Sequence, residues 1–351
     1  MRILHVAESF ASGTLEVIRT LSDGLASRGH EVIVAHGTLR ETPHDVAKLF
    51  DPRVELVALP WTRRTPWAQL AAARGLRRLV AERRPDVVHL HSSFAGAVGA
   101  MALGHGSRRI VYTPHGSALL RSDNRAKLAA YRAVERFVAR RVSIIGAVSE
   151  SEARLARSVS AATEVAVVPN GLPELDAHTP PPDRSESDPI VVGIGRLGTA
   201  RPAAPAARIL SAMSDVAKPV WIGDAAKDED AELLRRHGVE VTGWLPREAA
   251  MERLSGATAC LHWSAWDGQA MVILEALARD VIVVASDIVA NRELLGDAQV
   301  CADEEEAAAL LRAILTDPGT RETLSRAQGE RGKAFGADRM TEGWLRVYEA
   351  A

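Results

Sequence analysis

Short apolar runs alternate with helical patterns along this chain, and this alternation restricts its fold more than any other feature. In the first half, the apolar runs are residues 3–7, 31–36, 54–59, 87–91, 110–113 and 144–147, with amphipathic segments such as 15–28, 67–84 and 125–141 between them. The runs are rich in Ile and Val and alternate little with polar residues, which is typical of parallel strands covered on both faces. They predict a doubly wound α/β domain.

A polar, Pro-rich segment at 179–189 interrupts the pattern, which then restarts with apolar runs at 190–194, 220–222, 239–242, 259–262, 281–285 and 299–301. We therefore predict two Rossmann-like domains, residues 1–170 and 190–338, joined by a linker at 171–189. Residues 339–351 place Trp344, Leu345, Val347 and Tyr348 at helical spacing, and we expect this helix to pack back on the first domain. We expect the carboxyl edges of the two sheets to face each other across a cleft.

The composition suits a soluble protein of two ordinary domains. Of the 351 residues, 47% are hydrophobic, yet no apolar run is long enough to span a membrane. The first residues resemble a buried strand rather than a signal peptide. Cys260 and Cys301 stand alone in apolar runs, so we expect buried thiols without a disulfide or a metal. These features predict a cytoplasmic protein.

Charge is distributed unevenly. Residues 1–170 carry 24 Lys and Arg against 15 Asp and Glu, a net +9, and the remainder carries 19 against 30, a net −11. A basic half favours an anionic partner such as lipid headgroups or a lipid-diphosphate acceptor, with peripheral contact at the inner face of the membrane. Nucleic acid is not expected, because no binding motif or interleaved aromatic residues accompany the basic residues.

The segment at 266–278 contains the strongest chemical signal. Asp267 and Gly268 end a predicted loop, and the helix that follows contains Glu275, eight residues after Asp267. A helix N-terminus offers free backbone N–H groups and the positive end of the dipole, which bind phosphate. Glu275, two turns into the helix, can reach hydroxyls of the same ligand. The structural alternative is that Asp267 only caps the helix.

Three glycines after the first strand of the second domain match the dinucleotide fingerprint G-x-G-x-x-G: Gly193, Gly195 and Gly198. That motif needs a helix directly after the third glycine, and here Pro202 and Pro205 delay one. A nicotinamide site with Asp224 as its ribose-binding acid is therefore the weaker interpretation. In the other, Arg196 and Arg201 are two cations that clamp a diphosphate.

Other strand ends give weaker signals. Gly13 follows the first strand in a loop of small residues that suits close approach to a ligand. Ser92 or Ser93 can be a helix N-cap, and Ser149 with Glu152 fits a capping box. His115, between Pro and Gly, can bond a sugar hydroxyl or merely the backbone. Asn170-Gly171 marks a candidate hinge, and the acidic D-x-D at 228–230 suits a solvated helix face better than a metal site.

Taken together, these segments resemble the retaining, GT-B glycosyltransferases of family 4, in particular the bacterial enzymes of capsule, exopolysaccharide and O-antigen synthesis. The resemblance is carried, in order along the chain, by Gly13 and residues 89–93, 113–116, 168–171, 195–197, 242–246, 267–275 and 284–293.

The resemblance implies roles for individual residues. Arg196 and Arg201 hold the donor diphosphate, Glu275 the ribose, and His115 the sugar. Asp267 and the backbone of Gly268, Gln269, Ala270 and Met271 hold the donor sugar and phosphates, Gly243 and Leu245 border the base, and Gly13 lets the first loop close over the phosphates. Two positions depart from the family pattern: Arg201 replaces a Lys, and Asp267 replaces a Glu.

These features predict a retaining glycosyltransferase that moves a sugar from a nucleoside-diphosphate sugar, with UDP favoured over GDP, to a carbohydrate or lipid-linked acceptor in bacterial surface polysaccharide or glycolipid synthesis. The expected enzyme uses no cofactor and no metal. Two alternatives stay open: a catalytically weak nucleotide-sugar-binding protein, which the two departures motivate, and an NAD-type oxidoreductase.

Overall fold

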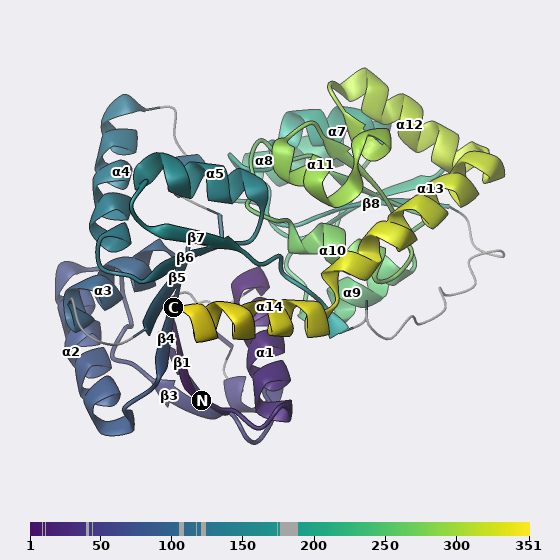
Figure 1. Ribbon diagram of the computed structural model, residues 1–351. Coiled ribbons are helices and arrows are strands. Elements are labelled where there is room, and N and C mark those ends of the chain that lie inside the picture. The colour runs from purple at the N-terminus through teal and green to yellow at the C-terminus, as the bar shows by residue number, and fades with distance from the viewer. Residues whose placement is uncertain are drawn as a thin grey trace. The chain divides into compact units, whose positions relative to one another are not determined.

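The computed structural model describes residues 1–8, 10, 12–39, 42–43, 45–104, 109–116, 118–120, 124–173, 175 and 189–351. Most of the expected linker, 171–189, lies outside these ranges. The chain forms two compact units (Figure 1). Unit 1 comprises Met1–Pro173 together with Ala337–Ala351, and unit 2 comprises Glu174–Gly336. Each unit is described by itself.

Unit 1 is built on a seven-stranded parallel sheet of order β3-β2-β1-β4-β5-β6-β7. Its strands are β1 (Arg2–Ala7), β2 (Glu31–His36), β3 (Glu55–Ala58), β4 (Val87–His91), β5 (Arg109–Thr113), β6 (Ile144–Ala147) and β7 (Glu164–Val167). Its helices are α1 (Ser12–Ser27), α2 (Pro66–Arg83), α3 (Ser93–Leu103), α4 (Arg125–Ala139), α5 (Glu150–Val159) and α14 (Ala337–Ala350), with short 3₁₀ turns η1 (Val46–Leu49) and η2 (Ala118–Leu120). The six expected strands are confirmed, while β7 was not predicted.

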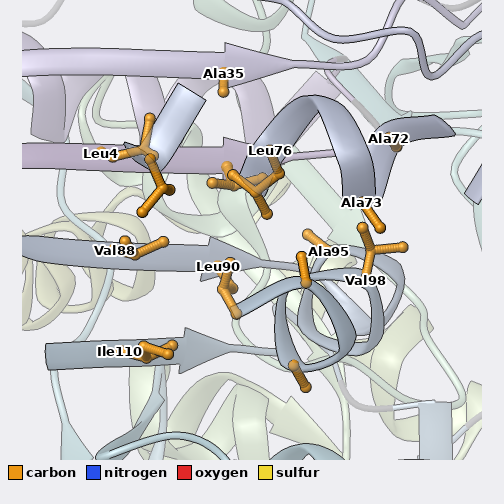
Figure 2. Packing of buried hydrophobic residues seen from close by; sticks show 14 of the residues in the cluster. Leu4, Ala35, Ala72, Ala73, Leu76, Val88, Leu90, Ala95, Val98 and Ile110 are labelled. Carbon is orange, nitrogen blue, oxygen red and sulfur yellow. The ribbon is translucent and has the colours of Figure 1, made fainter. Parts of the chain in front are cut away.

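One face of this sheet packs against α2, α3 and α4. Figure 2 shows Leu76 of α2 and Ala95 and Val98 of α3 among apolar residues of the strands. Strand residues on this face include Leu4, Ala35, Val88, Leu90 and Ile110, all buried. Small helix residues permit close packing, because a Cβ at Gly99 would overlap Leu90. Burial of each Leu or Val contributes about 1.5–3 kcal/mol to stability.

The opposite face of the sheet carries polar residues beneath α14. Alternate strand residues point to opposite faces, so His89 and His91 lie on the side away from Leu90. Trp344 and Tyr348 of α14 cover this side and are fully buried. Gly146 of β6 leaves room for the Trp344 ring, since a Cβ there would overlap it. The helix also packs across α1, as Figure 1 shows.

Unit 2 repeats the plan with a six-stranded parallel sheet of order β10-β9-β8-β11-β12-β13. Its strands are β8 (Ile190–Ile194), β9 (Lys218–Ile222), β10 (Glu240–Val241), β11 (Ala259–His262), β12 (Ile282–Ser286) and β13 (Val300–Cys301). Its helices are α7 (Ala203–Ser211), α8 (Asp228–Arg236), α9 (Arg247–Ser255), α10 (Met271–Leu277), α11 (Val289–Leu295), α12 (Glu304–Thr316) and α13 (Pro318–Gly332), with 3₁₀ turns η3 (Asp297–Gln299) and η4 (Lys333–Phe335). All six predicted strands of this half are confirmed.

Cap residues fix where several helices begin. Thr65 accepts a hydrogen bond from the N–H of Ala68 ahead of Pro66, the first residue of α2. Asp303 and Asp317 cap α12 and α13 in the same way. Cys260 and Cys301 are buried free thiols, as expected, and burial raises the pKa of Cys260 to about 12.

Candidate active site

The loop between β11 and α10 has the geometry of an open helix N-terminus. Asp267 accepts a hydrogen bond from the N–H of Gly268 at 2.9 Å and does not cap the helix. The N-cap residue of α10 is Ala270, which provides no side-chain hydrogen bond. The capping interpretation of Asp267 is therefore wrong. Gly268, Gln269 and Ala270 are buried, and Met271 begins the helix half-buried.

Arg201 and His262 converge on the Asp267 carboxylate. Arg201 Nη2 lies 3.4 Å from Asp267 Oδ2, and His262 Nε2 lies 3.6 Å from the same oxygen. The Arg201 Nε–H is buried, and none of the described residues accepts a hydrogen bond from it. A buried charged donor without a partner is costly, so this group suits an anionic ligand.

The ionisation states at this site follow from burial and neighbouring charge. Burial disfavours the Asp267 carboxylate, but the adjacent imidazole, guanidinium and backbone N–H outweigh burial and lower its pKa. Burial also lowers the pKa of His262, more than the carboxylate raises it. Near pH 7 the site therefore holds a carboxylate, a guanidinium and a neutral imidazole.

Glu275 lies in α10, as predicted, and its side chain is 5% exposed. Arg247, the first residue of α9, donates from Nη1 to Glu275 Oε1 at 2.5 Å. The Arg247 side chain is 38% exposed, so the pair runs from the interior of unit 2 to its surface. Arg247, 28 residues earlier in the chain, thus holds in place the carboxylate that the family resemblance assigns to a ribose.

The glycines of the fingerprint-like segment have structural reasons. A Cβ at Gly193 would overlap the Trp221 ring, whose Nε1–H donates to the Gly195 carbonyl at 2.9 Å. Helix α7 begins only at Ala203, after Gly198 and several further residues. The helix that a dinucleotide fingerprint requires directly after its third glycine is therefore missing.

Arg196 stands apart from the Arg201–Asp267 pair. Its side chain is 68% exposed, and its Nε lies 3.8 Å from Asp224 Oδ1. A side chain this exposed has a weak ion pair and freedom to move. Arg196 is therefore available to an anion at the end of β8.

Loops that follow β8, β9 and β10 meet closely at the carboxyl edge of the unit 2 sheet. The Gly195 carbonyl occupies the space that a Cβ at Gly223 would need. Gly223 pairs with Gly243, which adopts a left-handed φ of 71°. Nothing lies within 4 Å of a Cβ built at Gly243, and Leu245 is half-buried beyond it. Backbone groups thus dominate this edge.

In unit 1, Gly13 lies in the first turn of α1 and not in the preceding loop, because the helix begins at Ser12. That corrects the expected placement. His115 follows β5 with a left-handed φ of 53° and is half-buried. Its Nε2 bonds the Nδ1 of His91 at 2.8 Å, and not the backbone as the structural alternative supposed.

The serine motifs of unit 1 differ from the capping interpretation in part. Ser92 is the N-cap residue of α3, as expected, but its side chain makes no capping hydrogen bond, and Ser93 donates to Glu135. Ser149 does accept from the N–H of Glu152. The buried Glu152 carboxylate accepts from the N–H of Gly116 at 2.8 Å, which anchors the loop that carries His115. The acidic residues at 228–230 lie in the first turn of α8, where two of the three are exposed.

Sequence reasoning missed three residues that the structure brings to these sites: Arg247, His262 and His91. Arg247 directly follows the segment 242–246, and His262 ends a predicted strand, so their positions carried a signal. His91 lies within the segment 89–93 that carries part of the resemblance, but its bond to His115 depends on which strands are neighbours.

Two family models match the chain. The one described as Glycosyltransferase Family 4 matches residues 11–174, and the one described as Glycosyl transferases group 1 matches residues 188–317. Two Rossmann-like units, each with its own match, define a glycosyltransferase of the GT-B class. The chain is thus a glycosyltransferase, whose first unit matches the Family 4 model and whose second unit matches the group 1 model.

Solved structures share this fold. HepE of Anabaena in complex with UDP and glucose is 18% identical, with all of both chains covered and a TM-score of 0.81. The sucrose-phosphate synthase of Thermosynechococcus elongatus is also 18% identical, covers 100% of this chain and 99% of its own, and has a TM-score of 0.78.

A curated relative comes from Klebsiella pneumoniae. It is described as an uncharacterized 41.2 kDa protein in the cps region, and it is 23% identical over 313 residues, which are 85% of this chain and 84% of the relative. Within the described ranges, every helix is too short or too polar to cross a bilayer.

Proposed function

We propose that this glycosyltransferase moves a sugar from a UDP-sugar to a hydroxyl of a carbohydrate or lipid-linked acceptor, with retained anomeric configuration. The observation that carries the proposal is the anion site of unit 2: the buried, unpartnered Nε–H of Arg201 beside the uncapped N-terminus of α10. A departing diphosphate needs such preorganised positive charge. HepE, which has the same fold, binds UDP and glucose.

The described residues have distinct tasks in this reaction. Arg201 and Arg196 neutralise the leaving diphosphate, and the backbone from Gln269 to Met271 donates hydrogen bonds to its oxygens. Asp267, paired with Arg201, accepts from a sugar hydroxyl. Glu275, fixed by Arg247, accepts from the ribose. The nucleotide base of the donor lies beside Gly243 and Leu245.

Retention follows in this proposal from attack on the face that the leaving group vacates. The C1–O bond of the donor breaks, an oxocarbenium-like centre develops, and the acceptor oxygen bonds to C1 from the same side. The departing phosphate takes the acceptor proton, so no protein nucleophile is needed. The fixed cations act where charge develops, which lowers the barrier.

A test of stereochemistry uses UDP-glucose with water as a surrogate acceptor. Proton NMR at early times distinguishes the anomers of the released glucose before they interconvert. Initial release of the α-anomer supports retention, and initial release of the β-anomer contradicts it. Tight UDP binding without hydrolysis or transfer to any tested acceptor would instead support the nucleotide-sugar-binding alternative.

We further propose that unit 1 contacts an anionic membrane through α4. This helix carries four exposed cations, Arg125, Lys127, Arg132 and Arg136. Tyr131 and Val134 are exposed among them, at 36% and 42%. The helix's acid, Glu135, is buried and accepts hydrogen bonds from Tyr112 and Ser93. A helix with cations and apolar groups outward suits lipid headgroups, where each cation contributes about 1 kcal/mol.

Co-sedimentation with vesicles tests this contact. Vesicles containing one-third phosphatidylglycerol should bind the protein in low salt, and pure phosphatidylcholine vesicles should not. The double variant Lys127→Glu, Arg132→Glu should lose binding, while the double variant Arg235→Glu, Arg236→Glu at the exposed end of α8 serves as the matched charge control. Equal binding of both variants would contradict the role of α4.

A relative encoded in a cps region supports a role in surface polysaccharide synthesis.

A further inference from the structure

Four histidines gather on one face of the unit 1 sheet. His5 of β1 is in register with His89 of β4, so both side chains point to the same side, and His91 follows two residues later on that side. His115 comes directly after the neighbouring strand β5. The first three are fully buried, and His115 is half-buried.

Three of these rings form one hydrogen-bonded chain. His5 Nδ1 lies 2.9 Å from His91 Nε2, and His91 Nδ1 lies 2.8 Å from His115 Nε2. His89 is bonded separately, to the Tyr348 hydroxyl at 2.7 Å and the Thr113 hydroxyl at 2.8 Å. The chain therefore runs from the core of unit 1 outward to His115.

All three rings of the chain are neutral near pH 7. Burial lowers the pKa of His5 to about 3 and that of His115 to about 4. Burial, followed by the charges of the neighbouring histidines, lowers the pKa of His91 well below its usual value. Each neutral ring carries one ring proton, so the chain holds three.

Counting these protons leaves two arrangements. Each of the two inter-ring hydrogen bonds uses one proton, and the third resides at one end, on His5 Nε2 or on His115 Nδ1. Within the part of the chain that the structure describes, the buried His5 Nε2 has no hydrogen-bond partner, and no residue there bonds His115 Nδ1. Buried N–H groups without an acceptor are rarer than acceptors without a donor. The third proton therefore belongs on His115 Nδ1.

We propose that His5 and His91 are positioning residues that hold His115 as the neutral Nδ1–H tautomer, so that His115 donates a hydrogen bond to a ligand oxygen and does not act as a base. The proposal rests on the proposed function for the ligand's class: a sugar hydroxyl or phosphate oxygen of the donor. Glu152 supports the same geometry, because it anchors the N–H of Gly116 beside the ring.

A metal ion is the competing use of this cluster. Ligand atoms of His5, His89 and His91 lie within 4.8 Å of one another. Two imidazoles on one tetrahedral zinc, each bound at about 2.0–2.1 Å, have their nitrogens about 3.3 Å apart. The 2.9 Å between His5 Nδ1 and His91 Nε2 is shorter and typical of a shared proton. The spacing thus favours the hydrogen-bonded chain.

The direct test is ¹⁵N NMR of the full chain labelled at histidine, without ligand. Long-range ¹H–¹⁵N correlations at pH 7.5 show which ring nitrogen carries the proton, and His115→Gln identifies the His115 signals. The expected result is the Nδ1–H tautomer at His115. The Nε2–H tautomer, or a stoichiometric metal found by elemental analysis with His5, His89 and His91 signals shifted, would overturn the proposal.

A pair of variants separates positioning from general structural damage. His91→Phe breaks the chain and should convert His115 to a mixture of tautomers, whereas His89→Phe removes two hydrogen bonds on the same strand and should leave His115 unchanged. If His91→Phe does not fold, the wild-type tautomer still decides the matter. A His115 tautomer unaffected by His91→Phe would contradict the positioning role.

The kinetic readout uses donor turnover. With UDP-glucose, His91→Phe should lower kcat/KM about tenfold while the pH profile between 6 and 8 keeps its shape, because no base is removed. A new pH limb in this range, or one in the wild type that vanishes in His115→Gln, would refute donation by a neutral ring. The NMR result needs no turnover, so failure of the proposed function shows separately as an absence of UDP binding.

Discussion

Arg201 is the residue whose removal most directly probes the unit 2 anion site, and Arg201→Ala is the informative change. The side chain is 22% exposed, so water screens its charge only in part. A guanidinium about 4 Å from a phosphate oxygen contributes about 4 kcal/mol at an effective dielectric constant of about 20. Loss of one preorganised donor in comparable sites lowers kcat by about 10²–10³-fold. We expect a loss of that size in Arg201→Ala.

The assay is UDP release from UDP-glucose, with kcat and KM determined separately. Arg201→Lys retains the charge and should keep turnover within about tenfold of the wild type. Arg236→Ala, an exposed cation of α8 paired with Glu232, provides the control and should change nothing. Arg201→Ala with kcat within threefold of the wild type, in a folded protein, would refute the reasoning.

Three further predictions concern stability and reactivity. Gly193→Ala should destabilise unit 2 by about 1–3 kcal/mol in urea unfolding because its methyl group meets Trp221, whereas Gly329→Ala, which has open space, should not destabilise; equal effects would contradict this packing. Burial lowers the pKa of His5 from 6.5 to about 3, so only the unfolded chain takes up this proton as the pH falls below 6.5. The free energy of unfolding should therefore be constant above pH 6.5 and fall below it by up to about 1.4 kcal/mol per pH unit. An unchanged free energy of unfolding between pH 7 and 5 would contradict this. Cys260, buried with a pKa of about 12, should react with a thiol reagent at pH 8 only after unfolding, and rapid labelling of the native protein would show otherwise.

The sequence predicted every strand of the described residues except β7. Apolar runs located the other twelve strands of the described ranges, because strands packed in a parallel sheet need apolar residues. β7 is an edge strand with an exposed first residue and half-buried neighbours, so its apolar signal is weak. The observed helix ends agree with the predicted ends where caps and prolines mark them. Helix α1 differs, because it begins at Ser12, before the first residue of its apolar pattern.

The candidate site was predictable where one loop carries it. Asp267 and Glu275 belong to one loop–helix segment, and local spacing places both. Arg247 contacts Glu275 only because α9 and α10 pack together, and His5 meets His91 only because β1 lies beside β4. Neither neighbour relation follows from periodicity along the chain. At Gly193 the motif-like spacing has a packing reason, since a Cβ there would overlap the Trp221 ring.

The measurement that tests the central claim most directly is thermal unfolding of the wild type and Arg201→Ala with UDP, GDP, ADP and NAD. A ligand at 100 times its dissociation constant stabilises the folded protein by about 2.7 kcal/mol. The proposed function predicts stabilisation of the wild type by UDP, little by NAD, and a marked loss of the UDP effect in Arg201→Ala. Stabilisation by NAD alone, or a UDP effect that is unchanged in Arg201→Ala, would contradict it.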